Sequence, residues 1–79
     1  MEVIMKKIIS KNINELLEKR GWSKYRLEQV MGIDHDCIHR WCRGENSPSA
    51  ESLWKLACVF EVPVDRFYKG AEKWVSTFW

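Results

Sequence analysis

Apolar residues recur at intervals of three and four along most of this chain, which is the spacing of one face of an α-helix. The first such stripe predicts a helix that includes residues 9–19 and that residues 1–8 can extend backwards. Gly21 ends this helix, because glycine is favoured just past a helix end. The positions predicted to be buried are Ile9, Ile13, Leu16 and Leu17.

The stretch 23–43 predicts two short helices joined by a tight turn. Ser23 is a favourable N-cap for the first helix, and Gly32 lies where a helix end favours a left-handed residue. Asp34 is the expected N-cap of the second helix, since its carboxylate also suits the positive end of the helix dipole. The apolar stripe of the first helix consists of Leu27, Val30 and Met31.

The second of these helices has an apolar face and a polar face. At about 100° per residue, Trp41 and Cys42 fall beside Ile38 on the face predicted to be buried. A polar outer face is the usual state of any surface helix, so the context of this helix must decide its meaning. The opposite side, its flank and the exposed tip carry His35, Asp36, His39, Arg40 and Arg43.

The remaining chain continues the helical pattern. Turn residues predict a loop over 44–48, after which Ser49 caps a fourth helix. Pro63 separates that helix from a short fifth one, which Gly70 ends. The apolar positions of these two helices are Leu53, Leu56, Ala57, Phe60, Val64, Phe67 and Tyr68. We therefore predict an all-α fold.

The order of helix, glycine turn, helix and proline-containing loop is typical of a helix-turn-helix, which presents its second helix to the DNA major groove. The chain resembles the Cro and lambda-repressor-type (XRE-type) family of helix-turn-helix domains. The residues that carry this resemblance are Ile9, Ile13, Leu16, Gly21, Ser23, Leu27, Gly32, Ile33, Ile38, Trp41, Arg43, Gly44, Pro48, Ser49, Leu53, Leu56, Ala57, Val62 and Asp65.

Three positions depart from the pattern of that family. Lys24 stands where glutamine is usual, and Cys42 stands where glutamate is frequent. Glu28 stands where the family usually has a small residue such as alanine, at a site that faces the second helix closely. We expect the Glu28 carboxylate either to swing out into solvent or to pair with a base such as Arg40.

The resemblance implies a compact five-helix lambda-repressor-like domain over residues 9–69, between an N-terminal extension (1–8) and an aromatic C-terminal tail (70–79). It also implies sequence-specific binding of double-stranded DNA by a transcriptional regulator, a repressor of bacterial or phage type, with a recognition helix at about 35–42 in the major groove. The positions that match the family's base contacts are His35, Asp36, His39 and Arg40. Those that match its phosphate contacts are Ser23, Lys24, Arg43, Asn46 and Ser47.

Composition limits the other classes of protein. The chain has 79 residues, 46% of them apolar and 30% charged, which is typical of one globular domain, while a net charge of +2 does not by itself indicate nucleic-acid binding. Three cysteines without a signal-like segment favour a reducing, cytoplasmic compartment. No apolar run approaches the roughly 20 residues of a membrane span, so no membrane partner is expected. No catalytic constellation or phosphate-binding loop stands out, and we expect neither an enzyme nor a cofactor.

The cluster of His35, Cys37, His39 and Cys42 contains residue types that bind metal ions. The two histidines are four residues apart, a spacing that can hold one metal ion from a helix surface. However, Cys37 lies about 160° around the helix from His39, and Cys42 belongs to the buried flank. Cys58, one helix away, is the remaining thiol. We therefore expect no metal ligands and interpret the thiols as small packing residues.

Two alternatives to a DNA-binding regulator remain open. One is an antitoxin-like or other protein-binding helix-turn-helix module, which the weak net charge and the aromatic tail favour. The other is a metal- or redox-sensing switch, which the histidine and cysteine cluster favours more weakly. A protein partner and a role in DNA binding do not exclude each other.

The two ends of the chain carry apolar residues beyond the family pattern. Because a small monomer rarely exposes a large apolar patch, these ends predict either a homodimer, at least on DNA, or a tail that covers the domain's own core. The residues concerned are Val3, Ile4, Met5, Ile8, Trp74, Val75, Phe78 and Trp79.

If the tail is the dimer contact, the full chain should sediment as a dimer and a chain that ends at Lys69 should sediment as a monomer with a cooperative melt. Sedimentation velocity of the two proteins at micromolar concentration measures this. A full chain that stays monomeric at high micromolar concentration, with a truncated chain that only melts earlier, would show that the tail is part of the core.

Overall fold

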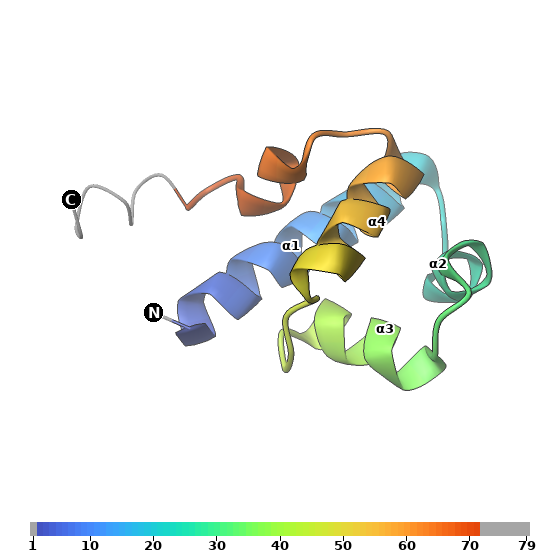
Figure 1. Ribbon diagram of the computed structural model, residues 1–79, viewed down its shortest axis with the longest axis horizontal. Helices are drawn as coiled ribbons and strands as arrows, with labels where there is room; N and C mark the ends of the chain where they lie inside the picture. The colour runs from blue at the N-terminus through green and yellow to red at the C-terminus, as the bar shows by residue number, and fades with distance from the viewer. Residues whose placement is uncertain (1, 72–79) are drawn as a thin grey trace.

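The computed structural model of the chain describes residues 2–71, with the side chains of residues 4–71. These residues form four α-helices and one 3₁₀-helix: α1 (Glu2–Arg20), α2 (Lys24–Met31), α3 (His35–Arg43), α4 (Ala50–Phe60) and η1 (Val64–Tyr68) (Figure 1). The predicted all-α class is therefore confirmed. None of the helices in this range is long and apolar enough to cross a bilayer. Trp74, Val75, Phe78 and Trp79, and the side chain of Val3, lie outside the described residues.

The first helix is extended backwards, as the sequence allowed, and only the fifth element differs in kind from its prediction. Helix α1 begins at Glu2, so the segment 1–8 continues the first helix as far as the structure describes it. The fifth element is a single 3₁₀ stretch, in which the amide of Arg66 donates to the carbonyl of Pro63 (3.0 Å). Five residues after a proline are too few for an α-helix to gain much hydrogen bonding, and the 3₁₀ form is common in such short pieces.

Most of the predicted helix ends are confirmed. The Ser23 Oγ accepts from the amide of Arg26 (3.1 Å), and Gly32 ends α2 with a φ of 67°. Ser49 caps α4 in the same way as Ser23 caps α2. The prediction for Asp34 is only half right, because it occupies the N-cap position of α3 without a side-chain capping hydrogen bond.

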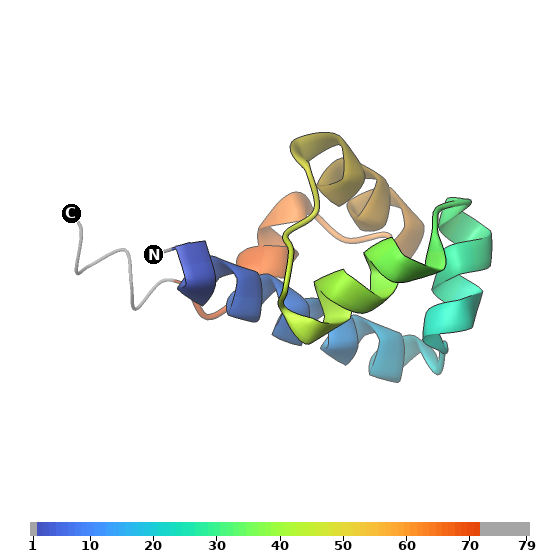
Figure 2. The same cartoon turned by 90° about the horizontal axis from the view of Figure 1, so that it is seen from below.

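Helix α1 lies alongside both α3 and η1. Helix α2 packs across the N-terminal end of α3 (Figure 2). The predicted core positions of α1 and α4 are buried. The prediction that Val30 belongs to the buried stripe of α2 is wrong, because Val30 is 42% exposed. Leu27 is fully buried, and Met31 packs against the core. Around a helix as short as α2, Leu27 and Met31 face inward and Val30 falls on the edge. The buried apolar residues are Ile9, Ile13, Leu16, Leu17, Leu27, Ile38, Trp41, Cys42, Leu53, Leu56, Ala57, Phe60 and Phe67.

One buried polar side chain attaches η1 to α1. Asn12 is 1% exposed, and its Oδ1 accepts from Arg66 (3.0 Å), which also contacts Glu15 (3.3 Å). A buried amide without partners would be costly, so these bonds fix the position of the chain after α4. The Nδ2 group of Asn12 donates to the carbonyls of Ile8, Phe67 and Lys69.

The three tryptophans of the described residues differ in burial. Trp41 is 7% exposed and Trp54 is 60% exposed, while Trp22 packs against Phe60 with ring centroids 5.5 Å apart. The buried Trp41 ring thus holds the inner face of α3 against the core.

Replacing Trp41 with alanine should lower the free energy of unfolding by roughly 3–5 kcal/mol, because it opens a cavity in a small core. Trp54→Ala is the matched control and should cost less than about 1 kcal/mol, since its ring is largely in water. Urea titration followed by circular dichroism measures both. A Trp41→Ala protein that melts within a few degrees of the parent would contradict the burial of this face.

Candidate nucleic-acid interface

Helix α3 presents a polar surface to solvent. Its inner face is buried at Ile38, Trp41 and Cys42. On the outer face the side chains of His35, Asp36, Arg40 and Arg43 are exposed and that of His39 is partly exposed. The predicted division of this helix into an inner and an outer face is confirmed. The DNA contacts assigned to these residues stay predictions.

The C-terminal end of α3 is fixed to α1 by two side-chain donors. The Cys42 carbonyl lies in the last turn of α3, where carbonyls lack a partner within the helix. It accepts from the Ser10 Oγ (2.5 Å) and from the Asn14 Nδ2 (3.0 Å), which lie one turn apart on α1. Gly44 follows with a φ of 76°, and a Cβ at this residue would lie 3.6 Å from the Cβ of Ser10. The chain therefore leaves α3 in close contact with α1.

Sequence reasoning missed Ser10 and Asn14. The available signal was a pair of polar residues, four apart, at the edge of the apolar stripe of α1. Nothing in the sequence indicates that both reach the Cys42 carbonyl, which lies 32 residues after Ser10 and 28 residues after Asn14.

The residues predicted to contact phosphates lie at the start of α2 and after α3. Ser23 uses its hydroxyl as a helix cap, Lys24 is partly buried, and Asn46 and Ser47 are exposed. The Arg43 Nε lies 2.7 Å from a carboxylate oxygen of Glu45, with both side chains more than half exposed. Such an exposed ion pair contributes only about 0–1 kcal/mol, so it can open when a phosphate approaches.

The Cys42 thiol is not a reactive group. Burial raises the pKa of the Cys42 thiol. The nearby charge of Lys24 acts in the opposite direction, but its effect is smaller. The thiol is therefore held in its neutral form, in which it is neither a nucleophile nor a ready metal ligand. Cys37 and Cys58 are exposed, which corrects the prediction that the thiols serve as packing residues.

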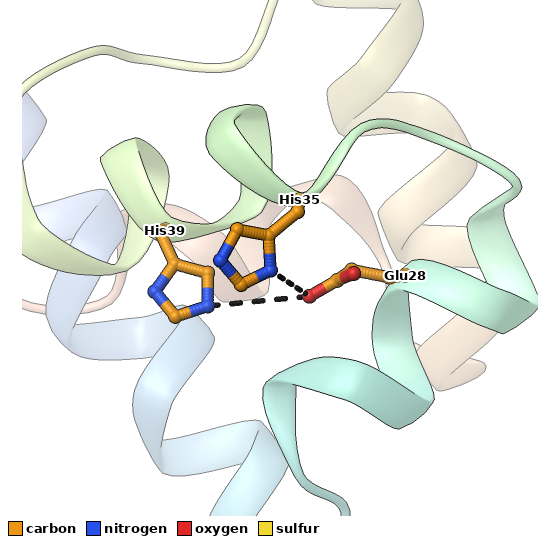
Figure 3. Close-up of side chains that lie close together, drawn as sticks. All are labelled: Glu28, His35 and His39. Atoms are coloured by element: carbon orange, nitrogen blue, oxygen red, sulfur yellow. Dashed lines mark hydrogen bonds and ion pairs between the residues drawn. The ribbon is translucent and has the colours of Figure 1, made fainter.

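Glu28 pairs with a basic side chain, as one of the two predicted outcomes had it, but the partner is His35 and not Arg40. The Glu28 side chain is 15% exposed, and it accepts a hydrogen bond from the His35 Nδ1 (2.9 Å) instead of swinging out or pairing with Arg40. The His39 Nε2 lies 4.0 Å from the same carboxylate oxygen, as Figure 3 shows. Helix α2 packs on α3, and Glu28 therefore faces the two histidines of α3.

The two histidine rings also contact each other. Their centroids are 4.0 Å apart, with an angle of 38° between the ring planes. Helix α2 therefore positions two of the four side chains predicted to contact bases. The Arg40 side chain, in contrast, forms no hydrogen bond or ion pair within the described part of the chain.

Comparison with known proteins agrees with this geometry. Residues 13–67 match the helix-turn-helix family HTH_3. The HTH-type transcriptional regulator SutR of Escherichia coli (strain K12) is 33% identical over 61 residues, which cover 77% of this chain and 34% of SutR. A crystal structure of an HTH_3 family transcriptional regulator from Vibrio cholerae superposes with a TM-score of 0.83 at 27% identity, over 98% of this chain and 43% of that one.

The four helices, with α2 and α3 joined through a glycine turn, define a helix-turn-helix domain. The chain belongs to the HTH_3 family, of Cro and lambda-repressor type, which confirms the resemblance seen in the sequence. It spans about a third to less than half of the length of the relatives it matches.

The attachment of α3 to α1 can be tested by removing both donors. The double substitution Ser10→Ala and Asn14→Ala should lower the free energy of unfolding by roughly 1–3 kcal/mol, because the Cys42 carbonyl loses its partners. Lys11→Ala, at an exposed position of the same helix, should change it by no more than about 0.5 kcal/mol. Equal urea midpoints for the double variant and the parent would show that the two hydrogen bonds do not hold α3.

Proposed function

We propose that this chain binds double-stranded DNA in a sequence-specific manner as a transcriptional regulator, with α3 as its recognition helix in the major groove. The observation that carries the proposal is the division of α3 into a buried inner face and a polar outer face at the second position of a helix-turn-helix. Membership of the HTH_3 family supports it, as do the names of the relatives, which are transcriptional regulators.

Base recognition is assigned to the first two turns of α3. Arg40 can donate to both O6 and N7 of a guanine, and Asp36 can accept from the amino group of a cytosine. His35 and His39 complete the set and are within reach of neighbouring base pairs. The exposed guanidinium of Arg40 has no partner to give up among the described residues, so it is the side chain best prepared for a base contact.

Phosphate binding is assigned to residues on either side of α3. Ser23 and Lys24 lie at the N-terminus of α2, where backbone amides and the helix dipole favour an anion. Arg43, Asn46 and Ser47 follow the recognition helix. Contacts of this kind set the position of a domain on the duplex but carry no sequence information by themselves.

We propose that the regulator is a repressor and that it works as a homodimer. A single domain reads few base pairs, whereas two domains related by a twofold axis read two half-sites about 34–36 Å apart on one face of the duplex. A repressor of this type acts by occupying its operator, so the proposal requires no cofactor.

Two arginines should separate base recognition from phosphate binding. Arg40→Ala should weaken binding to the preferred site by roughly 1–3 kcal/mol and relax discrimination at one base pair. Arg43→Ala should weaken binding to all sequences and reduce the slope of log K against log salt by about 0.9, the equivalent of one phosphate.

The experiment is a binding selection from random duplex DNA, followed by affinity titrations of the selected and scrambled duplexes at several salt concentrations. Equal losses for both arginine variants on both duplexes would contradict the division of roles. A selection that enriches no sequence with the parent protein would contradict sequence-specific binding and favour the protein-binding alternative.

A further inference from the structure

Three groups that bind transition metals meet between α2 and α3. They are the Glu28 carboxylate, the His35 Nδ1 and the His39 Nε2, all within 4.8 Å of one another (Figure 3). In the part of the chain that the structure describes, no other group of three histidine, cysteine or acidic side chains comes this close. The carboxylate comes from α2 and the two imidazoles from α3, so the ligands are drawn from two elements of the fold.

We propose that Glu28, His35 and His39 form a binding site for a divalent transition-metal ion, with zinc as the best match. Two imidazole nitrogens and one carboxylate oxygen are donors that suit zinc, cobalt and nickel, whereas magnesium and calcium prefer all-oxygen sites. Three protein ligands and a water molecule complete a tetrahedron around zinc.

The distances are close to those that such a site requires. Bonds of about 2.0–2.2 Å to zinc place two tetrahedral ligand atoms roughly 3.3 Å apart. The Glu28 oxygen is 2.9 Å from the His35 nitrogen and 4.0 Å from the His39 nitrogen, so small side-chain rotations bring the three ligands to this spacing. The two rings are already neighbours, with centroids 4.0 Å apart.

Burial favours the same interpretation. The Glu28 side chain is 15% exposed and is held in place by the packing of α2, whereas His35 and His39 are 62% and 31% exposed. The carboxylate is therefore the enclosed ligand, and the two histidines lie on its solvent side, from which an ion can enter. This also accounts for an acid at a place where helices α2 and α3 pack closely, since a bound cation would neutralise it.

The exposed thiols of Cys37 and Cys58 are potential competing metal ligands outside the proposed site. Thiolates bind zinc and cobalt well, so a test must distinguish them from the site at Glu28. A variant with both Cys37→Ser and Cys58→Ser is the matched control, because it removes the exposed thiols and leaves all three proposed ligands in place.

The experiment titrates the full chain, produced without a polyhistidine tag, with cobalt chloride and then displaces cobalt with zinc chloride. We expect one equivalent to bind, with the visible absorption bands of tetrahedral cobalt and without thiolate charge-transfer bands. Glu28→Ala and His39→Gln should each weaken binding at least roughly tenfold, and the double serine variant should bind as the parent does.

Melting of the same proteins gives a second measurement. Zinc at about tenfold above its dissociation constant should raise the Tm of the parent by roughly 5–10 °C, because the ion binds the folded state. His39→Gln should melt like the parent without zinc and lose this rise. Undetectable binding by the parent, full binding by His39→Gln, or loss of binding in the double serine variant would each overturn the proposal.

A consequence of the site, which rests on the proposed function, is that zinc withdraws His35 and His39 from base pairs. Zinc should then weaken binding to the selected duplex in the parent and have no effect in Glu28→Ala. The metal titrations contain no DNA, so their result is independent of the proposed function. Equal effects of zinc on the two proteins would contradict competition between metal and DNA.

Discussion

The two hydrogen bonds that the Cys42 carbonyl accepts determine which face of α3 is turned to solvent. Apolar contacts of Ile38 and Trp41 hold α3 against the core, but such contacts are non-directional and tolerate rotation of a short helix. The bonds from Ser10 and Asn14 are directional, and they act on the backbone of α3. A helix of nine residues fixed at its C-terminal end in this way can present only one side to solvent. The outer face therefore depends on α1 as much as on the sequence of α3 itself.

Local features of this fold could be predicted because they are encoded by neighbouring residues. Ser23 and Gly32 define the ends of α2 through their own chemistry, and the spacing of Ile38 and Trp41 predicts which face of α3 is buried. Where tertiary packing decides, the same reasoning fails. Val30 satisfies the apolar period of α2 and is nevertheless exposed at its edge.

The hydrogen-bond partners of side chains were the part of the candidate site that sequence reasoning could not supply. Asn12 joins carbonyls 55 and 57 residues away, and a single sequence carries no record of such pairs. Glu28 shows most clearly that a side-chain partner could not be predicted from the sequence. Its departure from the family pattern showed that the position mattered, but the choice between solvent, Arg40 and His35 depends on the distance between two helices. The helix period places side chains around one helix and says nothing about that distance.

The separation between residues that hold α3 and residues on its outer face bears on how such a protein diversifies. Substitutions at Asp36 or Arg40 break no hydrogen bond or ion pair among the described residues, so these two positions can change one at a time without loss of a partner. His35 and His39 are different, because both lie against a carboxylate on another helix. A change at His39 leaves the hydrogen bond between His35 and Glu28 in place, whereas a change at His35 removes it, and a compensating change at position 28 of α2 can follow. Substitutions on the outer face of α3 are thus independent at Asp36 and Arg40 and coupled to α2 at His35 and His39.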